Sequence, residues 1–312
     1  MTAADPVVVV GAGLAGVTCA RTLQAAGTQV LLLDRGRRIG GRMASRRLDG
    51  RPVDIGASYL TVSDPTFAAV VADWHERGLA RPWTDTFAVI GEEPKAGPLR
   101  WGAPGGLRSL VEDLADGLEV VDATTVRAVR RKDDGWRVDD RPASAVVLAM
   151  PDPQAHRLLA DDLRAELPAP AGYEPVLALV ATWAERCWAF DGLFVNDHPS
   201  LSWVADDGTR RGDDAPVLVA HTTPAYAREH LEDPAAAGPE LTAALRELVG
   251  APAPETSLVH RWSFARPAAG RSEAFALTDT GLGLCGDGWA EKPRVEAAYL
   301  SGRALAEALL AR

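Results

Sequence analysis

Cysteine is scarce in this sequence. The 312 residues include 3 cysteines, Cys19, Cys187 and Cys285, which lie far apart and form no CxxC pair. Isolated thiols exclude a disulfide framework and a cysteine-rich zinc site, and they are typical of a reducing compartment. We therefore expect no metal ion and a cytoplasmic protein.

Long hydrophobic runs are also missing. No apolar stretch reaches the length of a membrane span without charge or a turn residue, so we expect no transmembrane helix. Residues 1–6 carry neither a basic region nor a cleavage site, which predicts that there is no secretory leader.

Basic residues are outnumbered by acidic residues. There are 33 Lys and Arg residues against 43 Asp and Glu residues, and the formal net charge is −10. This balance argues against a broad surface for nucleic acid or an anionic membrane, although a local pocket can still attract a small anion. The remaining composition, 47% hydrophobic and 24% charged, is that of a globular protein with an ample core.

A glycine-rich turn near the amino terminus carries the first chemical signal. Residues 7–10 predict a buried parallel strand and residues 17–26 predict a helix, with GAGLAG between them. In such a GxGxxG turn, Gly11 permits the tight turn and Gly13 lets the backbone approach a pyrophosphate. Gly16 lets the helix pack on the strand. The turn therefore predicts a dinucleotide site.

Two further features complete this site. The backbone amides at the helix start, around Leu14 and Ala15, favour phosphate. Asp34 ends the next strand, where a carboxylate can accept hydrogen bonds from ribose hydroxyls. The acid argues against a 2′-phosphate at this position, but the motif alone does not separate NAD from FAD.

A basic turn after Asp34 adds candidate phosphate contacts. Paired glycines followed by arginine let backbone and guanidinium meet one phosphate together. The candidates are Arg35, Gly41, Arg42 and Met43.

The carboxyl-terminal block favours FAD over NAD. Gly286 and Asp287 follow an apolar strand, and the Asp287 carboxylate could bond ribityl or phosphate oxygens. Pro293 opens the last helix, so the free amides near Arg294 and Val295 could stabilise a reduced isoalloxazine. The motifs at the two ends of the chain together predict a single FAD-binding site.

Short apolar runs separated by turn residues dominate the chain after residue 80 and predict an antiparallel sheet. The expected fold is therefore α/β, with a Rossmann-like FAD-binding domain of parallel sheet and helices and an inserted antiparallel-sheet substrate domain. The FAD-binding domain is expected over residues 1–80, 100–155 and 255–312, and the substrate domain over residues 81–99 and 156–254.

These motifs give the chain a family resemblance. It resembles the glutathione-reductase-type flavoproteins of the amine oxidase superfamily, and within them it is most similar to bacterial renalase-type proteins. The matching segments are VVVVGAGLAGVTCARTLQAAGTQVLLLD, RRIGGRM, VDIGASYLT, GAPGGLRSL, LAMP and GDGWAEKPRVEAAYLSGRALAEAL. The resemblance thins between residues 153 and 255.

The resemblance implies non-covalent FAD, contacted by the motif residues above, with the backbone of Val126 on the adenine side. The cysteine that binds flavin covalently in some relatives has no match, and we expect Cys285 to be buried packing. A bound flavin accepts a hydride itself, so no side-chain nucleophile is required.

Five aromatic or histidine residues are candidates for lining the substrate pocket. They are Trp203, His221, His260, Trp262 and Trp289. Core packing is the alternative for each tryptophan, and a hydrogen-bonded structural role is the alternative for each histidine.

Three functions remain open. The resemblance implies renalase-like oxidation of dihydro-NAD(P) isomers, with a nicotinamide dinucleotide as substrate, oxygen as acceptor and hydrogen peroxide as product. An oxidase of small amines or a desaturase of an apolar metabolite is the second function. A non-catalytic escort-type interaction protein on the same fold is the third, and the intact glycine motifs argue against it.

Overall fold

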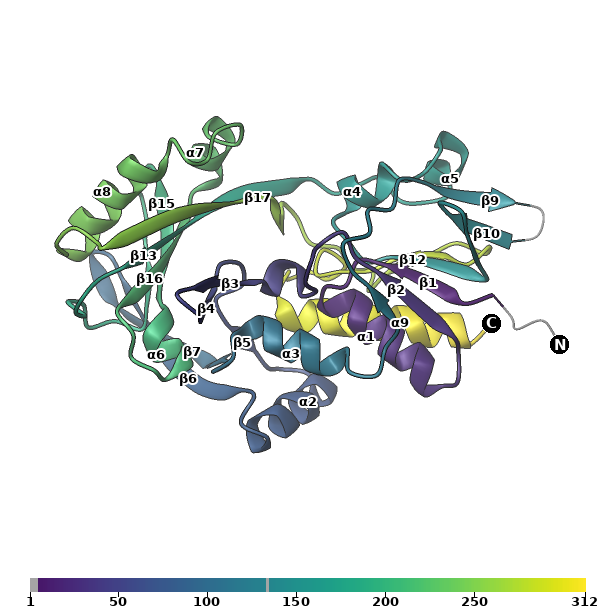
Figure 1. Ribbon diagram of the computed structural model, residues 1–312, viewed down its shortest axis with the longest axis horizontal. Helices are drawn as coiled ribbons and strands as arrows, with labels where there is room; N and C mark the ends of the chain where they lie inside the picture. Colours follow the sequence, from purple (N-terminus) through teal and green to yellow (C-terminus); the bar gives the residue numbers. More distant parts are fainter. Residues whose placement is uncertain (1–4, 133–134) are drawn as a thin grey trace. The chain divides into compact units, whose positions relative to one another are not determined.

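The structure is a computed structural model that describes residues 5–132 and 135–312. The sequence also predicts a turn at Asp133 and Asp134, and these two residues, like residues 1–4, lie outside the described residues. The chain forms two compact units (Figure 1). The first contains the chain up to Arg42, residues 111–173 and the chain from Arg266 onward, and the second contains residues 43–110 and 174–265.

A six-stranded sheet in the order β18-β19-β12-β1-β2-β8 organises the first unit. Its strands are β1 (Val7–Val10), β2 (Val30–Leu33), β8 (Val120–Val121), β12 (Ala145–Leu148), β18 (Ala276–Leu277) and β19 (Leu282–Leu284). All neighbouring strands are parallel except β18, which runs antiparallel to β19. The four valines of β1 are all buried, as expected for a strand covered on both faces.

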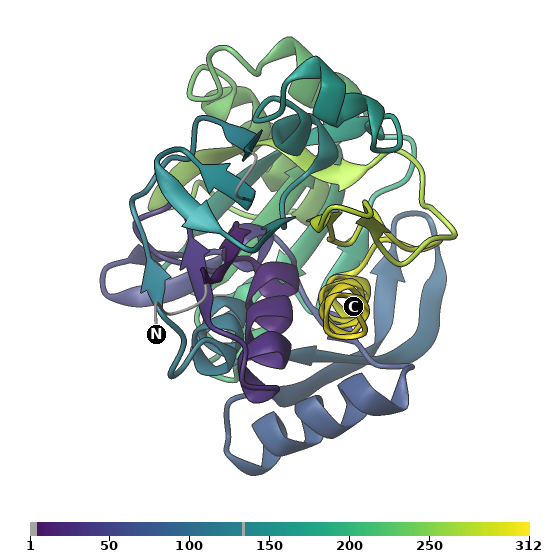
Figure 2. The same ribbon diagram turned by 90° about the vertical axis from the view of Figure 1, so that its right-hand side faces the viewer.

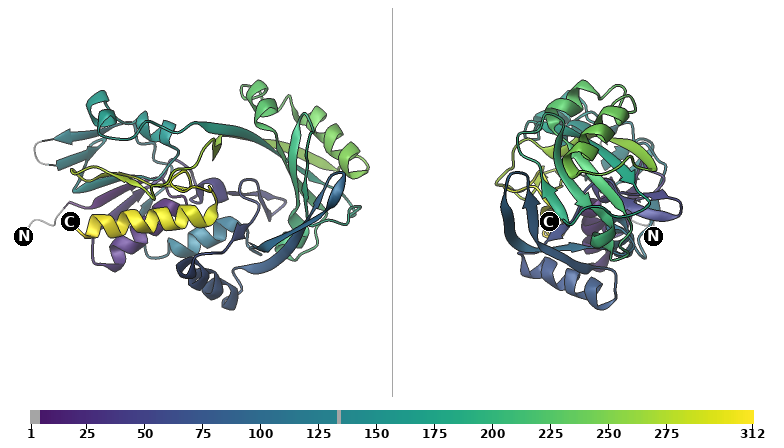
Figure 3. Two further views of the ribbon diagram at one scale, coloured as in Figure 1. Left: turned by 180° about the vertical axis from the view of Figure 1, so that it is seen from behind. Right: turned by 90° about the vertical axis from the view of Figure 1, so that its left-hand side faces the viewer.

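Helices from opposite ends of the chain pack together in this unit. Helix α1 (Leu14–Ala25) lies beside α9 (Val295–Leu310), and Figures 2 and 3 show them in purple and yellow. A Cβ atom at Gly302 of α9 would lie 2.1 Å from the Ala15 carbonyl oxygen, so the two backbones are in close contact. The predicted meeting of the two chain ends is therefore present.

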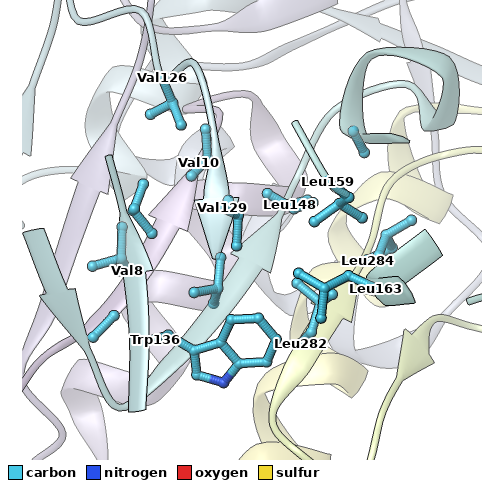
Figure 4. Close-up of a cluster of buried hydrophobic side chains, with 14 of the residues drawn as sticks. Val8, Val10, Val126, Val129, Trp136, Leu148, Leu159, Leu163, Leu282 and Leu284 are labelled. Carbon is cyan, nitrogen blue, oxygen red and sulfur yellow. The ribbon is translucent and has the colours of Figure 1, made fainter. Parts of the chain in front are cut away.

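The rest of the first unit covers this sheet. An antiparallel sheet of β9 (Val129–Lys132), β10 (Gly135–Val138) and β11 (Arg141–Ala143) and the short helices α4 (Asp152–His156) and α5 (Asp161–Ala165) belong to it. The core lies between the two sheets, where Val8, Leu148 and Leu282 contact the layer of Trp136 (Figure 4).

An eight-stranded sheet in the order β17-β13-β16-β15-β14-β6-β7-β5 organises the second unit. Its strands are β5 (Leu60–Thr61), β6 (Arg81–Val89), β7 (Glu92–Gly102), β13 (Tyr173–Thr182), β14 (Gly192–Phe194), β15 (Leu201–Asp206), β16 (Val217–Thr222) and β17 (Thr256–Pro267). Leu177, Leu179 and Ala220 on one face pack against Leu241 and Leu245 of helix α8 (Gly238–Val249).

Smaller elements complete the second unit. They are the 3-10 turn η1 (Gly41–Met43), the hairpin of β3 (Ser45–Leu48) and β4 (Arg51–Asp54), and helices α2 (Pro65–Glu76), α3 (Leu107–Leu114), α6 (Asp207–Arg211), α7 (Pro224–Glu229) and α8 (Gly238–Val249). Both η1 and α3 cross a division between the units.

The borders of the compact units differ from the expected domain borders. Residues 43–80 lie in the second unit because β5 pairs with β7, with Leu60 opposite Trp101. Residues 156–173 lie in the first unit because Leu159 and Leu163 join its core. Pairing between distant segments thus sets the borders, and composition alone does not reveal it.

Candidate cofactor site

The glycine-rich turn joins β1 to α1 in the first unit. Gly13 is the N-cap of α1, no side chain caps this end, and the first turn of the helix contains no acidic residue. The amide groups of the first turn therefore point out of the helix end together with its partial positive charge. This arrangement suits a phosphate group.

The three motif glycines serve different purposes. A Cβ atom at Gly11 would lie 2.5 Å from the Ala149 carbonyl oxygen, and at Gly16 it would lie 1.9 Å from the Gly11 carbonyl oxygen. A Cβ atom at Gly13 would make only an ordinary contact, 3.7 Å from the Cα of Gly41, and its φ of −79° is open to any residue. The fold thus demands Gly11 and Gly16 but does not demand Gly13. The space beside Gly13 is therefore free of close contacts within the fold.

Asp34 binds the turn from the end of β2. Its Oδ2 accepts a hydrogen bond from the Ala12 amide at 2.6 Å, and its Oδ1 accepts one from the Gly36 amide at 2.6 Å. Each carboxylate oxygen can accept a second hydrogen bond, so a ribose hydroxyl is still a suitable partner. Asp34 therefore holds the turn in place as well as marking the predicted ribose position.

The other residues predicted after Asp34 fall in different surroundings. Gly41 lies against Gly13, since a Cβ atom at Gly41 would be 3.1 Å from the Gly13 Cα. Arg35 is exposed, and Met43 is buried within the second unit. The structure therefore brings Gly41 to the glycine turn of its own unit.

Arg42 and Asp287 bind each other. The guanidinium donates to both carboxylate oxygens, with Nη2 to Oδ1 at 2.6 Å and Nη1 to Oδ2 at 3.0 Å. Burial acts to lower the pKa of Arg42, but Asp287 and Tyr173 outweigh it and raise this pKa, so the group stays charged. Two predicted cofactor residues thus form a bidentate ion pair between the amino-terminal and carboxyl-terminal motifs.

The loop after β19 is fixed at both of its ends. The Gly286 amide donates to the Ser301 hydroxyl of α9 at 3.0 Å. Arg294 is the N-cap of α9 and pairs with the buried Glu296 at 2.7 Å, while Val295 begins the helix. The loop therefore delivers the amino end of α9 to the same edge of the sheet as α1.

The side chains of Val126, Trp289 and Cys285, all of the first unit, are buried. Val126 packs with Val10 and Val129 in the core (Figure 4), so only its backbone could serve a ligand. Trp289 is 3% exposed and joins the same core, which favours the packing alternative for this residue. Cys285 is fully buried, which raises the pKa of its thiol and confirms the expected role in packing.

The other pocket candidates share one face of the eight-stranded sheet in the second unit. Trp203 lies opposite His221 on paired strands, and Trp262 packs on Val180 and Val219 of the same face. His260 lies two residues from Trp262 on β17, and their ring centroids are 4.7 Å apart. This face is the one that α8 leaves uncovered.

Hydrogen bonds fix the tryptophans of this face. The Trp203 indole donates to the Ser58 hydroxyl at 3.0 Å, and the Trp262 indole donates to the Ile55 carbonyl at 2.7 Å. Burial and the charges of Arg46 and Arg261 lower the pKa of His260. His260 is therefore neutral at pH 7.

A buried ionic network that reaches Ser58, the partner of Trp203, was not predicted. Asp207 pairs with Arg210 and with Arg211, whose Nε lies 2.9 Å from Oδ2 of Asp207. Asp54 lies 3.2 Å from Nη2 of Arg211, and Arg210 donates to the Ser58 carbonyl at 2.7 Å. The network thus holds the loop that binds Trp203. The charged DGTRR segment at 207–211 is the only sequence signal, and it resembles an ordinary surface turn.

Outside residues 1–4 and 133–134, no group of three or more His, Cys, Asp or Glu side chains is arranged to hold a metal ion. Across the same part of the chain, no helix has the length and apolar character needed to span a membrane.

The chain is similar to curated flavin enzymes over part of its length. It is 48% identical to polyamine oxidase 2 of Arabidopsis thaliana over 59 residues, covering 19% of this chain and 12% of that protein. It is 45% identical to putrescine oxidase of Kocuria rosea over 65 residues, covering 21% and 14%. It is 36% identical over 142 residues to a Mycobacterium tuberculosis protein provisionally described as a flavin-containing monoamine oxidase, covering 41% and 30%. The chain therefore spans less than a third of the length of these relatives.

Solved structures share the fold over the whole chain. A putrescine oxidase bound to putrescine has a TM-score of 0.74 at 17% identity and covers 99% of both chains. Cyclohexylamine oxidase from Brevibacterium oxydans has a TM-score of 0.75 at 14% identity, covering 99% of this chain and 100% of that one. These likenesses confirm the expected α/β fold.

Family models decide between the two dinucleotides. Residues 9–74 match the NAD(P)-binding Rossmann-like domain, and residues 76–310 match the flavin-containing amine oxidoreductases. The second match covers most of the chain and confirms the flavin cofactor expected from the carboxyl-terminal block. The chain belongs to the family of flavin-containing amine oxidoreductases.

Proposed function

We propose that this protein is an FAD-dependent oxidase that takes a hydride from a small molecule and passes the electrons to oxygen, giving hydrogen peroxide. The observation that carries this proposal is the contrast between the motif glycines: the space beside Gly13 serves no contact of the fold. When bound, FAD would supply the hydride acceptor. We assign its binding domain to the first unit.

The chain's own residues would hold the cofactor without covalent attachment. The first-turn amides of α1 would bind the pyrophosphate, and Asp34 would accept a bond from the ribose. The ion pair of Arg42 and Asp287 would join the amino-terminal and carboxyl-terminal motifs beside the flavin end of the cofactor. The amino end of α9 would place its partial positive charge where the reduced ring gains negative charge.

We propose dihydro-NAD(P) isomers, the renalase-like substrates, as the first substrate class. The resemblance of the motifs supports this, and so does the face that carries the partly exposed Trp262 and neutral His260, whereas Trp203 is 8% exposed and packs against Phe87. Flat aromatic surfaces bind a dihydropyridine ring by stacking. The nearby charges of Arg46 and Arg261 suit a substrate with phosphate groups better than a cationic amine.

A small amine is the second candidate substrate class. Its support is the family itself, together with relatives whose names include polyamine and putrescine oxidases. Aromatic faces can also bind an ammonium group. Phe87, however, which packs with Trp203, already has a cation on its ring. The guanidinium carbon of Arg100 lies 4.1 Å from the Phe87 ring centroid, so this ring is not open to an ammonium group.

A cytoplasmic location is part of this proposal. Its support is that all 3 cysteines are free, including the exposed Cys187, which suits a reducing compartment.

Anaerobic reduction of the bound flavin tests the proposal. The purified protein is mixed with dihydronicotinamide isomers, ordinary NADH, monoamines or polyamines, and the visible flavin band is followed. We expect a dihydronicotinamide isomer to bleach it at roughly 1 per second or faster. Bleaching by an amine alone would establish the second candidate. A protein that stays colourless after incubation with FAD would contradict the oxidase and support the escort-type alternative.

A further inference from the structure

We propose that Arg271 is a positioning residue that fixes the carboxyl-terminal cofactor loop, residues 286–291, by holding Trp289. This inference rests on the proposed function, because it assumes that the loop binds FAD. Arg271 lies outside every sequence motif described above, in the segment between β17 and β18. All the residues that carry the argument belong to the first unit.

Arg271 contacts the loop at two points. Its guanidinium carbon lies 4.2 Å from the centroid of the Trp289 ring, a cation–π contact. Its backbone amide donates to the Ala290 carbonyl at 3.0 Å. The preceding residue is also tight against the loop, since a Cβ atom at Gly270 would lie 2.2 Å from the Glu291 carbonyl oxygen.

The guanidinium of Arg271 also binds groups that follow strand β12 of the six-stranded sheet. Its Nη2 lies 2.6 Å from Oδ2 of Asp152 and donates to the Ala169 carbonyl at 2.8 Å. Asp152 is the first residue of α4 and lies shortly after β12, the neighbour of β1 in the sheet. Arg271 thus links the cofactor loop to the strand that borders the glycine turn.

Burial makes this link stronger than a surface contact. The side chains of Arg271 and Asp152 are 15% and 3% exposed, and Trp289 is 3% exposed. A cation–π contact gains strength when the cation is desolvated, and the paired carboxylate compensates the buried charge. Lysine could keep the charge over the ring, but its ammonium lacks the planar face that stacks on the indole.

The loop is held on its other side by the groups next to Asp287. Asp287 binds Arg42, and a Cβ atom at the next residue, Gly288, would lie 2.8 Å from the Tyr173 hydroxyl. Trp289 therefore sits between two fixed points. A shift of its ring would displace Asp287 and the start of α9, which are the groups assigned to the flavin end.

Release of FAD from the holoprotein tests this inference. The variants are Arg271→Gln, Arg271→Lys and Asp152→Asn. The control is Arg303→Gln, which removes an exposed ion pair with Glu307 in the same unit. We measure the FAD dissociation constant by fluorescence on dilution, the visible circular dichroism of the bound flavin, and the melting temperature of the apoprotein.

We expect Arg271→Gln to raise the dissociation constant roughly tenfold and to change the flavin dichroism. Arg271→Lys should recover part of both effects, and Arg303→Gln should change neither. A lowered melting temperature with unchanged FAD affinity and dichroism would overturn the inference, because the role would then be structural only. If Arg271→Gln does not fold, Arg271→Lys and Asp152→Asn decide in the same way. Wild-type protein that binds no FAD would instead contradict the proposed function.

Discussion

A side chain added at each motif glycine meets a different neighbour. This difference distinguishes glycines required for folding from a glycine required for ligand binding. We predict that Gly13→Val folds but binds no FAD, because its side chain would fill the space assigned to the pyrophosphate. Gly16→Ala should instead destabilise the protein by about 1–3 kcal/mol through a clash with the Gly11 carbonyl. Flavin absorbance and thermal unfolding measure the two effects. A normal flavin spectrum for Gly13→Val would mean that the turn does not hold the pyrophosphate.

The ion pair of Arg42 and Asp287 gives a second prediction for single residues. Asp287→Ala removes the partner of a guanidinium whose side chain is 26% exposed, which costs about 1–3 kcal/mol of stability. It should also weaken FAD retention, measured as flavin occupancy after dialysis. Asp287→Asn should have a smaller effect. In the double variant with Arg42→Gln the losses should be less than additive, because both changes break one interaction. Unchanged occupancy would refute the assignment of Asp287.

At the scale of elements, the short helix α6 is held by charges rather than by apolar packing. Asp207 is fully buried between Arg210 and Arg211. We predict that Asp207→Asn destabilises the second unit by about 3–5 kcal/mol, because two buried guanidinium groups would then share Asp54 as their remaining carboxylate. Urea unfolding measures the loss. Asp214→Asn is the matched control, since Asp214 is exposed and its φ of +54° is readily adopted by asparagine.

The same network predicts the response to acid. Burial acts to raise the pKa of Asp207, but Arg210, Arg211 and Arg51 outweigh it and hold this pKa below the ordinary value of 3.8. A carboxyl with a lowered folded-state pKa contributes stability that is present above its unfolded pKa and lost as the pH falls through the folded value. Wild-type stability should therefore fall below about pH 4. Asp207→Asn should show a shallower fall, and parallel acid curves would contradict this assignment.

Elements with local signals could be predicted from the sequence, and contacts between distant elements could not. Asp64 followed by Pro65 is the local pattern of a helix start, and these residues begin α2, where the Asp64 side chain accepts from the Thr66 and Phe67 amides. Arg42 meets a partner 245 positions away, and Arg271 meets an aspartate 119 positions earlier. Neither pair leaves a pattern in a short window of sequence. The glycine turn was predictable because its strand, glycines and helix are contiguous.

For the whole molecule, FAD binding should add to the stability of the folded chain. A ligand that binds only the folded state stabilises it by RT ln(1 + [L]/Kd), about 2.7 kcal/mol at a concentration 100 times the dissociation constant. We predict that the melting temperature of the apoprotein rises with added FAD, and that Gly13→Val abolishes this rise. AMP and ADP, which contain only part of the cofactor, should give smaller rises. An FAD-independent melting temperature in wild-type protein would oppose the cofactor assignment.

The position of β19 in the six-stranded sheet has a consequence for biosynthesis. The strand pairs with β12, which pairs with β1, so the first unit needs residues 7–10, 145–148 and 282–284 at once. A nascent chain on the ribosome has made the glycine turn long before it makes β19 and α9. Until β19 is made, strand β12 is an unpaired edge of the incomplete sheet and can pair with the wrong strand. On the proposed assignment of FAD to the first unit, cofactor capture would be a late event, and chaperones that shield nascent strands should raise the yield of yellow protein.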